Sequence, residues 1–248
     1  MPSVSNAGVR INYEVEGRGE PLVLLHGWSC EGRYWREFGY VPKLVDDFTV
    51  ILPDLRGHGG SDNPQDGDFS GAAFASDVIA VLDDMGIDSA HIFGYSLGGW
   101  VAFELAATHR PRVKTAIVGG AHPYAEDMSG MRSLPPPALV RYWDGLGAPL
   151  SDASKKRILA FTHEQLAAMI PDRKDESARL ADLDLRSLLI CGTNDARFEG
   201  MRRYAESHEN CTFLPIQDAD HLQAWFRSEL PLKELQRFLR RADLSQSG

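Results

Sequence analysis

The chain has 248 residues, of which 43% are hydrophobic and 25% charged, and it carries a formal net charge of -9 at pH 7. These proportions are those of an ordinary soluble globular protein, and the length suits one α/β domain with an insertion. Because nucleic-acid affinity rests on clustered Lys and Arg, the acidic balance argues against a nucleic-acid partner.

The N-terminal segment 1–17 has no apolar core of signal-peptide length, and the chain contains no apolar run of about 18 residues. We therefore expect a soluble, cytoplasmic protein that does not bind membranes. Cys30, Cys191 and Cys211 are widely spaced and form no Cys-x-x-Cys pair. Neither a disulfide framework nor a zinc site is indicated, and the cysteines are expected to be reduced and structural.

Short apolar runs alternate with helical patterns along the chain. Runs rich in Val, Ile and Leu that alternate with helices are typical of a mostly parallel, doubly wound sheet covered on both faces. Residues 9–17 alternate apolar and polar side chains instead, as an antiparallel edge strand would. The predicted strands lie at 9–17, 21–27, 48–54, 90–96, 113–120, 185–192 and 211–217, and the main predicted helices at 70–85, 97–109, 197–206 and 224–240.

The interval 122–184 breaks this rhythm, because it contains several short helix signals and no strand signal. Pro137 suits the first turn of a helix through 138–146, and Thr162 with Gln165 has capping-box spacing before a helix that ends at Pro171. We predict a helical lid at 122–184, inserted into a core domain of 1–121 and 185–248. Such a lid lies beyond the carboxyl ends of the strands, where open α/β sheets bind ligands.

The stretch from His91 to Trp100 reads HIFGYSLGGW and places Ser96 between a predicted strand and a predicted helix. Gly94 and Gly98 give the Gly-x-Ser-x-Gly spacing of a sharp strand-to-helix turn that exposes a nucleophilic serine. Gly99 allows the following helix to approach the sheet. The sequence therefore predicts Ser96 as a nucleophile.

A serine hydroxyl needs a base to remove its proton, and that base is usually a histidine oriented by a carboxylate. Asp195 follows one predicted strand and His221 follows the next, so both are expected at the same sheet edge as Ser96. The chain order Ser, Asp, His is the one expected on such a fold. We predict Asp195 as the acid and His221 as the base.

Other carboxylates and histidines compete for these roles. Asp218 and Asp220 lie close to His221 in sequence, but such near neighbours seldom reach their own imidazole. His26, His58 and His122 do not follow the last strand; we expect the first two to pack loops and His122 to line the pocket.

The oxyanion of an acyl transfer needs preorganised N–H donors. Leu97, directly after the predicted nucleophile, supplies one backbone N–H. We expect the other from Trp28, in the loop after the strand VLLHG, with the indole of Trp28 as a wall of the pocket.

The segments LLHGW, PDLRGHGGSD, GYSLGG, CGTND and DADH occur in the order seen in the α/β-hydrolase superfamily. From about residue 9 to 239 the chain resembles that superfamily, and its HGW segment is similar to that of small bacterial serine esterases and cofactor-free perhydrolases. The resemblance implies an α/β-hydrolase fold, with Ser96, Asp195 and His221 as the triad and the Trp28 and Leu97 amides as the oxyanion hole.

The resemblance implies a serine hydrolase of small to medium carboxylic esters or lactones, working through an acyl-enzyme on Ser96. No cofactor and no metal are expected, the partner is a small-molecule substrate, and a homodimer is left open. Members with an elbow aspartate, among them epoxide hydrolases, attack alkyl carbon, and Ser96 sets this chain apart from them. Thioesterases, carbon–carbon hydrolases of ring-fission products and receptor-like members with little turnover remain alternatives.

Aromatic and methionine side chains of the predicted lid are expected to roof the pocket above Ser96 or to pack the lid onto the core. With Trp28, the pocket residues we predict are His122, Tyr124 and Trp143. The lid set is Tyr124, Met128, Met131, Tyr142, Trp143 and Phe161.

Overall fold

A single eight-stranded sheet, in the order β1-β2-β4-β3-β5-β6-β7-β8, forms the centre of the protein. The structure is a computed structural model that describes residues 2–64 and 67–246, and for 241–246 only the backbone. The strands are β1 Ser3–Asn6, β2 Val9–Gly17, β3 Glu20–Leu25, β4 Phe48–Pro53, β5 Ala90–Tyr95, β6 Val113–Gly119, β7 Ser187–Gly192 and β8 Cys211–Ile216. The predicted mostly parallel, doubly wound sheet is confirmed.

Strands β3 to β8 are parallel, and β2 pairs antiparallel with β4. The prediction that residues 9–17 form the edge strand is wrong, because β1 pairs with the outer side of β2. The two strands form a hairpin through Ala7 and Gly8, both of which have positive φ. That pattern is typical of a two-residue type I′ turn.

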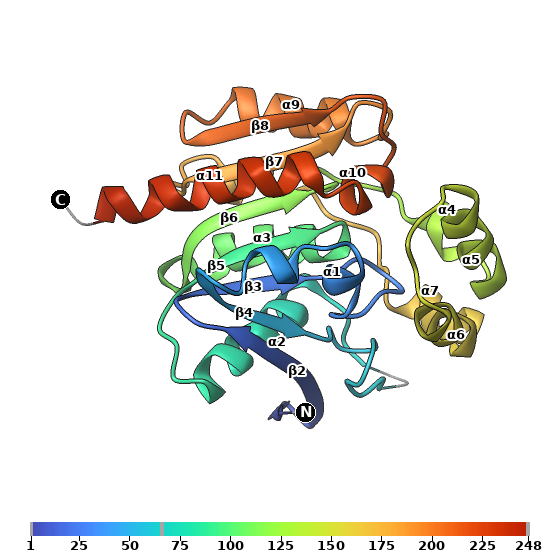
Figure 1. The fold of residues 1–248 in the computed structure, drawn as a ribbon. Helices are drawn as coiled ribbons and strands as arrows, with labels where there is room; N and C mark the ends of the chain where they lie inside the picture. The colour runs from blue at the N-terminus through green and yellow to red at the C-terminus, as the bar shows by residue number, and fades with distance from the viewer. Residues whose placement is uncertain (1, 65–66, 247–248) are drawn as a thin grey trace.

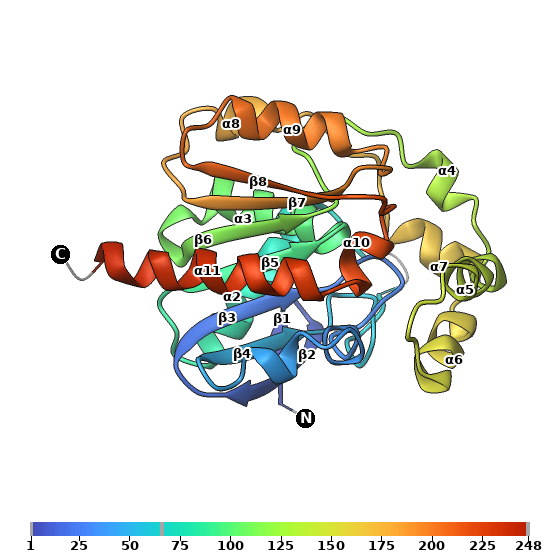
Figure 2. The same cartoon turned by 45° about the horizontal axis from the view of Figure 1, so that its top comes forward.

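Helices cover both faces of the sheet (Figures 1 and 2). In Figure 1, α2 and α3 lie behind the sheet and the red helix α11 crosses in front of it. Helix α3 is buried along most of its length. The helices outside the β6–β7 interval are α1 Tyr34–Glu37, α2 Gly71–Asp84, α3 Leu97–Thr108, α9 Phe198–Glu206, α10 Gln223–Phe226 and α11 Glu229–Gln246, with short 3-10 turns at Val41–Lys43 and Arg110–Arg112.

The C-terminal helical region consists of α10 and α11 rather than the single helix predicted at 224–240. Pro231 explains the break, since its ring would clash with the carbonyl of Arg227 in a continuous helix. The backbone at Arg227 leaves the helical region, and the Ser228 hydroxyl donates to the Phe38 carbonyl at 2.5 Å. In the part of the chain that the structure describes, no helix has the length and hydropathy needed to cross a bilayer.

The helices between β6 and β7 are α4 Ser129–Arg132, α5 Pro136–Gly145, α6 Asp152–Ala160, α7 His163–Ala168 and α8 Ser177–Leu180. Helices α4 to α7 project beyond the carboxyl ends of the strands, at the right of Figure 1. The predicted capping box of Thr162 and Gln165 is confirmed at the start of α7. Helix α8 packs on α3. The division into 1–121 with 185–248 and 122–184 stays a prediction, and its residues 1, 65–66 and 247–248 lie outside the described residues.

Candidate active site

Ser96 occupies the turn between β5 and α3 with φ 55° and ψ -109°. A residue other than glycine in this region of backbone space costs about 1–3 kcal/mol, and such strain is typical of functional sites. The surroundings require glycine at two nearby positions. A Cβ on Gly94 would lie 1.9 Å from the Gly98 carbonyl oxygen, and a Cβ on Gly98 would lie 2.2 Å from the Leu25 carbonyl oxygen. The chain can make this turn only with glycine at both positions.

Hydrogen bonds hold the turn against its neighbours. The Ser96 backbone N–H donates to the Gly119 carbonyl at 2.8 Å, and the Gly98 N–H donates to the His26 carbonyl at 3.0 Å. The turn is therefore fixed to β6 on one side and to the loop after β3 on the other. Rigid elements set the place of the Ser96 side chain.

Ser96, His221 and Asp195 are brought together at the carboxyl ends of β5, β8 and β7. His221 Nδ1 lies 2.6 Å from Asp195 Oδ2, and His221 Nε2 lies 3.0 Å from Ser96 Oγ. The tautomer that satisfies both contacts has its proton on Nδ1, donates to Asp195 and accepts the Ser96 hydroxyl proton at Nε2. This is the geometry of a nucleophile, its base and an orienting carboxylate.

The carboxylate of Asp195 is buried and yet stays ionised. Burial opposes its ionisation, but His221 and the Arg197 guanidinium outweigh burial and hold the pKa of Asp195 well below its usual value. The Arg197 backbone N–H donates to Asp195 Oδ1 at 3.0 Å, which leaves Oδ2 for His221. Tyr95 fixes the other side of the histidine, since its hydroxyl donates to the His221 carbonyl at 2.7 Å.

Neither competing aspartate contacts the His221 ring. Asp220 Oδ1 accepts the backbone N–H groups of Leu222 and Gln223, at 3.0 and 2.8 Å, and so caps the start of α10. Asp218 has positive φ, and its carbonyl accepts from Arg227. The structure thus places Asp195, and not these two, against the histidine.

The competing histidines lie in buried loops. His26 Nε2 accepts the Leu55 N–H at 3.0 Å, and burial lowers the pKa of His26 to about 4. Burial also lowers the pKa of His58, to about 3, and the two rings meet edge to face. Both side chains pack the loops, as predicted, and their lowered pKa values keep them neutral at pH 7.

The loop that follows β3 passes beside Ser96 and carries Trp28. Within the described residues, neither the Trp28 nor the Leu97 backbone N–H donates to another protein group. Two unpaired N–H groups beside a nucleophile are what an oxyanion hole requires. The Trp28 indole N–H donates to the Leu166 carbonyl at 2.9 Å, which joins this loop to α7.

A cavity of about 160 Å³ opens onto Ser96 and His221. Trp28 and Trp143 line it, as the sequence predicts, and so do Met131 and Tyr142. Most of the remaining wall is apolar. It consists of Gly27, Ser29 and Cys30 from the loop after β3, Leu134 and Leu139 from α5 and the segment before it, Leu222 and Trp225 from the start of α10, and Arg197 from the loop after β7.

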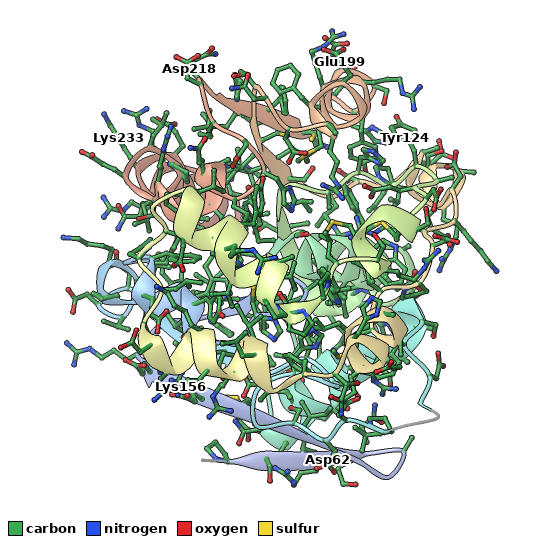
Figure 3. The ribbon with its side chains drawn as sticks, turned by 90° about the vertical axis from the view of Figure 1, so that its right-hand side faces the viewer. Asp62, Tyr124, Lys156, Glu199, Asp218 and Lys233 are labelled. Atoms are coloured by element: carbon green, nitrogen blue, oxygen red, sulfur yellow. The ribbon has the colours of Figure 1, made fainter. Side chains whose placement is uncertain are left out.

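His122 and Tyr124 do not line this cavity, so their prediction as pocket residues is wrong. The segment after β6 runs along α9 instead of crossing above Ser96. His122 packs against Gly200, and the Arg203 guanidinium lies 3.7 Å from the Tyr124 ring centroid. Figure 3, which looks onto helices α4 to α7, shows Tyr124 toward the edge of this face, on the same side as Glu199 of α9.

Arg197 is the functional candidate that the sequence analysis missed. Its guanidinium lines the cavity and lies 3.6 Å from Asp195 Oδ1. The segment GTNDAR carried a signal for it, because Arg197 follows the candidate acid Asp195 by two residues and so shares its loop.

The described residues include no group of three or more His, Cys, Asp or Glu side chains placed to bind one metal ion. All three cysteines are free of disulfides.

Comparisons with known proteins agree with this fold. The chain is 40% identical over 111 residues to a soluble epoxide hydrolase from Corynebacterium sp. (strain C12), covering 45% of this chain and 38% of that protein. It is 34% identical over 116 residues to a 2-hydroxymuconate semialdehyde hydrolase from Pseudomonas sp. (strain CF600), covering 46% and 41%. These alignments span less than half the length of either relative.

The structure of an esterase from Rhodococcus sp. ECU1013 superposes with a TM-score of 0.80 at 27% identity, covering 96% of this chain and 97% of that one. Residues 20–175, more than half of the chain, match the family described as alpha/beta hydrolase fold. The predicted α/β-hydrolase fold is confirmed, and the chain belongs to the α/β-hydrolase family.

Proposed function

We propose that this protein is a serine hydrolase of small carboxylic esters or lactones, with Ser96 as nucleophile. The observation that carries the proposal is the chain of contacts Ser96–His221–Asp195 at the mouth of an apolar cavity, with contact distances of 3.0 and 2.6 Å. The likeness to an esterase at 27% identity supports it. Because this chain has a serine at the turn, opening of epoxides is not proposed.

In the proposed reaction, Ser96 Oγ attacks the ester carbonyl carbon while its proton passes to His221 Nε2. The negative charge on the carbonyl oxygen is stabilised by the N–H groups of Trp28 and Leu97. When the tetrahedral intermediate collapses, the alcohol oxygen leaves with the proton from His221. Water then attacks the acyl-serine, again with His221 as base, and releases the acid.

The cavity limits the acyl group. A dry cavity of about 150 Å³ holds benzene, so one of about 160 Å³ suits an acyl chain of about four to six carbons. Among the described residues that line the cavity, Arg197 is the only Lys, Arg, Asp or Glu, and its guanidinium is paired with Glu126 at 2.5 Å. An acyl group without charge therefore fits this wall best.

We expect kcat/KM to be highest for p-nitrophenyl butyrate, lower for octanoate and lowest for palmitate, because each added methylene must find room in an enclosed site. Leu139→Ala, which removes part of the wall, should move the preference toward octanoate. Leu159→Ala is the control, since Leu159 is exposed on α6. A maximum at palmitate, or a rate jump above the critical micelle concentration, would contradict this size limit.

A second candidate is hydrolysis of carbon–carbon bonds in ring-fission dienones, favoured by the 34% identity to a 2-hydroxymuconate semialdehyde hydrolase. The same side chains would serve it. Negligible ester turnover with fast dienone cleavage would select this candidate. Absence of turnover on esters, lactones and dienones alike would instead favour a ligand-binding protein with little activity.

A further inference from the structure

Arg197 approaches the candidate acid and base together. One of its terminal nitrogens, Nη1, lies 3.4 Å from His221 Nδ1 and 3.6 Å from Asp195 Oδ1. Because Nδ1 already donates its proton to Asp195, the approach of the guanidinium to the ring is a contact between two donors. If His221 took up a proton, its positive charge and that of the Arg197 guanidinium would repel each other at this distance.

Glu126 holds Arg197 in this place. Its carboxylate accepts from Arg197 Nη2 at 2.5 Å and from Arg173 Nη1 at 3.0 Å. Burial opposes ionisation of Glu126, but Arg173 and Arg197 outweigh burial and hold the pKa of Glu126 below its usual value. The carboxylate is therefore charged and joins two cations.

This ion cluster joins both ends of the lid to the candidate triad. Glu126 lies before α4 and Arg173 after α7, both within the predicted lid, and their backbones exchange hydrogen bonds of 3.0 Å in both directions. Arg173 is buried, and its guanidinium lies 5.8 Å from the centroid of the Trp100 ring on α3. The position of Arg197 is thus set by the paired lid segments and not by solvent.

The charges of the cluster balance while His221 is neutral. Two carboxylates, Asp195 and Glu126, face two guanidinium groups, Arg173 and Arg197. Removing the positive charge of Arg197 and removing the negative charge of Glu126 therefore change the electrostatic potential at His221 in opposite directions. Within the described residues, four further polar or titratable side chains lie on the elements that neighbour His221: Ser96, Tyr95, Tyr142 and Asp220.

We infer that Arg197 is a positioning residue: held by Glu126 beside the Asp195 carboxylate, its guanidinium opposes a positive charge on the His221 ring, so that the acid limb of the reaction's pH profile depends on the Glu126–Arg197 pair. This inference rests on the proposed serine nucleophile. It does not depend on the natural substrate.

The test is the rate at which a phosphonofluoridate labels Ser96, measured from about pH 4 to pH 9, because the acid limb of such a profile reports the base of the free enzyme. The variants are Arg197→Met, Arg197→Lys and Glu126→Gln. Arg202→Met is the control on α9, the helix that begins directly after Arg197, since the ion pairs of Arg202 are with exposed Glu199 and Glu206. Thermal unfolding is followed for each.

In Arg197→Met the midpoint of the acid limb should move to higher pH by about one unit. In Glu126→Gln it should move to lower pH by less, and in Arg197→Lys and Arg202→Met it should stay near the wild-type value. A purely structural role would lower the rate at all pH values and leave the midpoint unmoved.

Midpoints that stay at the wild-type value in both Arg197→Met and Glu126→Gln, or that move in the same direction, overturn the inference. If Glu126→Gln does not fold, the comparison of Arg197→Met with Arg197→Lys decides alone. Absence of labelling in the wild-type protein would instead contradict the proposed function, so the two failures are distinguishable.

Discussion

Replacing Ser96 or His221 by Ala is expected to lower kcat by about a million-fold each, with hardly any further loss in the double variant. The reason is that Ser96 Oγ and His221 Nε2, 3.0 Å apart, act as one unit. The nucleophile without its base is as inactive as the base without its nucleophile. Steady-state kinetics with p-nitrophenyl butyrate measures kcat for the wild-type protein and each variant.

Ser5→Ala and His163→Ala serve as controls for that experiment, because both residues are exposed and lie outside the cavity wall. Both should keep wild-type turnover. Additive losses in the double variant would show that Ser96 and His221 act independently, contrary to the proposed mechanism.

Asp195→Asn is expected to cost about ten-thousandfold in kcat, the loss that a wrongly held imidazole tautomer causes in serine proteases. Asp195 accepts from His221 Nδ1 at 2.6 Å, whereas an amide can present its own N–H there and turn the ring. The measurement is kcat at neutral pH, with circular dichroism to verify the fold.

Asp218→Asn and Asp220→Asn are matched controls on the loop of His221. Their carboxylates do not contact the imidazole, so turnover should stay within about tenfold of wild type. Near-wild-type kcat in Asp195→Asn, together with a large loss of kcat in Asp218→Asn or Asp220→Asn, would show that the acid has been assigned to the wrong residue.

The sequence predicted the candidate triad because each of its members follows a strand. Parallel strands end at one sheet edge, so residues that are 99 or 26 positions apart in sequence can be placed together without knowledge of the packing. The glycines at 94 and 98 added backbone geometry that few other sites share. Local pattern and topology together were sufficient for this part of the molecule.

The edges of the sheet were predicted less well. Residues 3–6 are too short and too polar to read as a strand, although Ala7–Gly8 form a two-residue hairpin turn. The break before α11 was missed because the apolar pattern continues across Arg227, while Pro231 forbids the helix there.

The pocket wall could not be predicted because it depends on how the lid packs. His122 and Tyr124 lie at the start of the predicted lid in sequence, but the segment from β6 follows α9 and carries both away from Ser96. Trp143 reaches the cavity because α5 turns its buried face toward Trp225. Such contacts follow from tertiary packing, which hydrophobic pattern alone does not determine.

The most direct test of the proposed function is the site of covalent modification by a phosphonofluoridate probe. The protein is incubated with the probe, digested and analysed by peptide mass spectrometry, with Ser96→Ala as the control. We predict one adduct, on Ser96, in the wild-type protein and none in the variant, because Ser96 is the hydroxyl that lies 3.0 Å from the His221 base. An adduct on another residue, or an active protein that takes no label, would contradict the account.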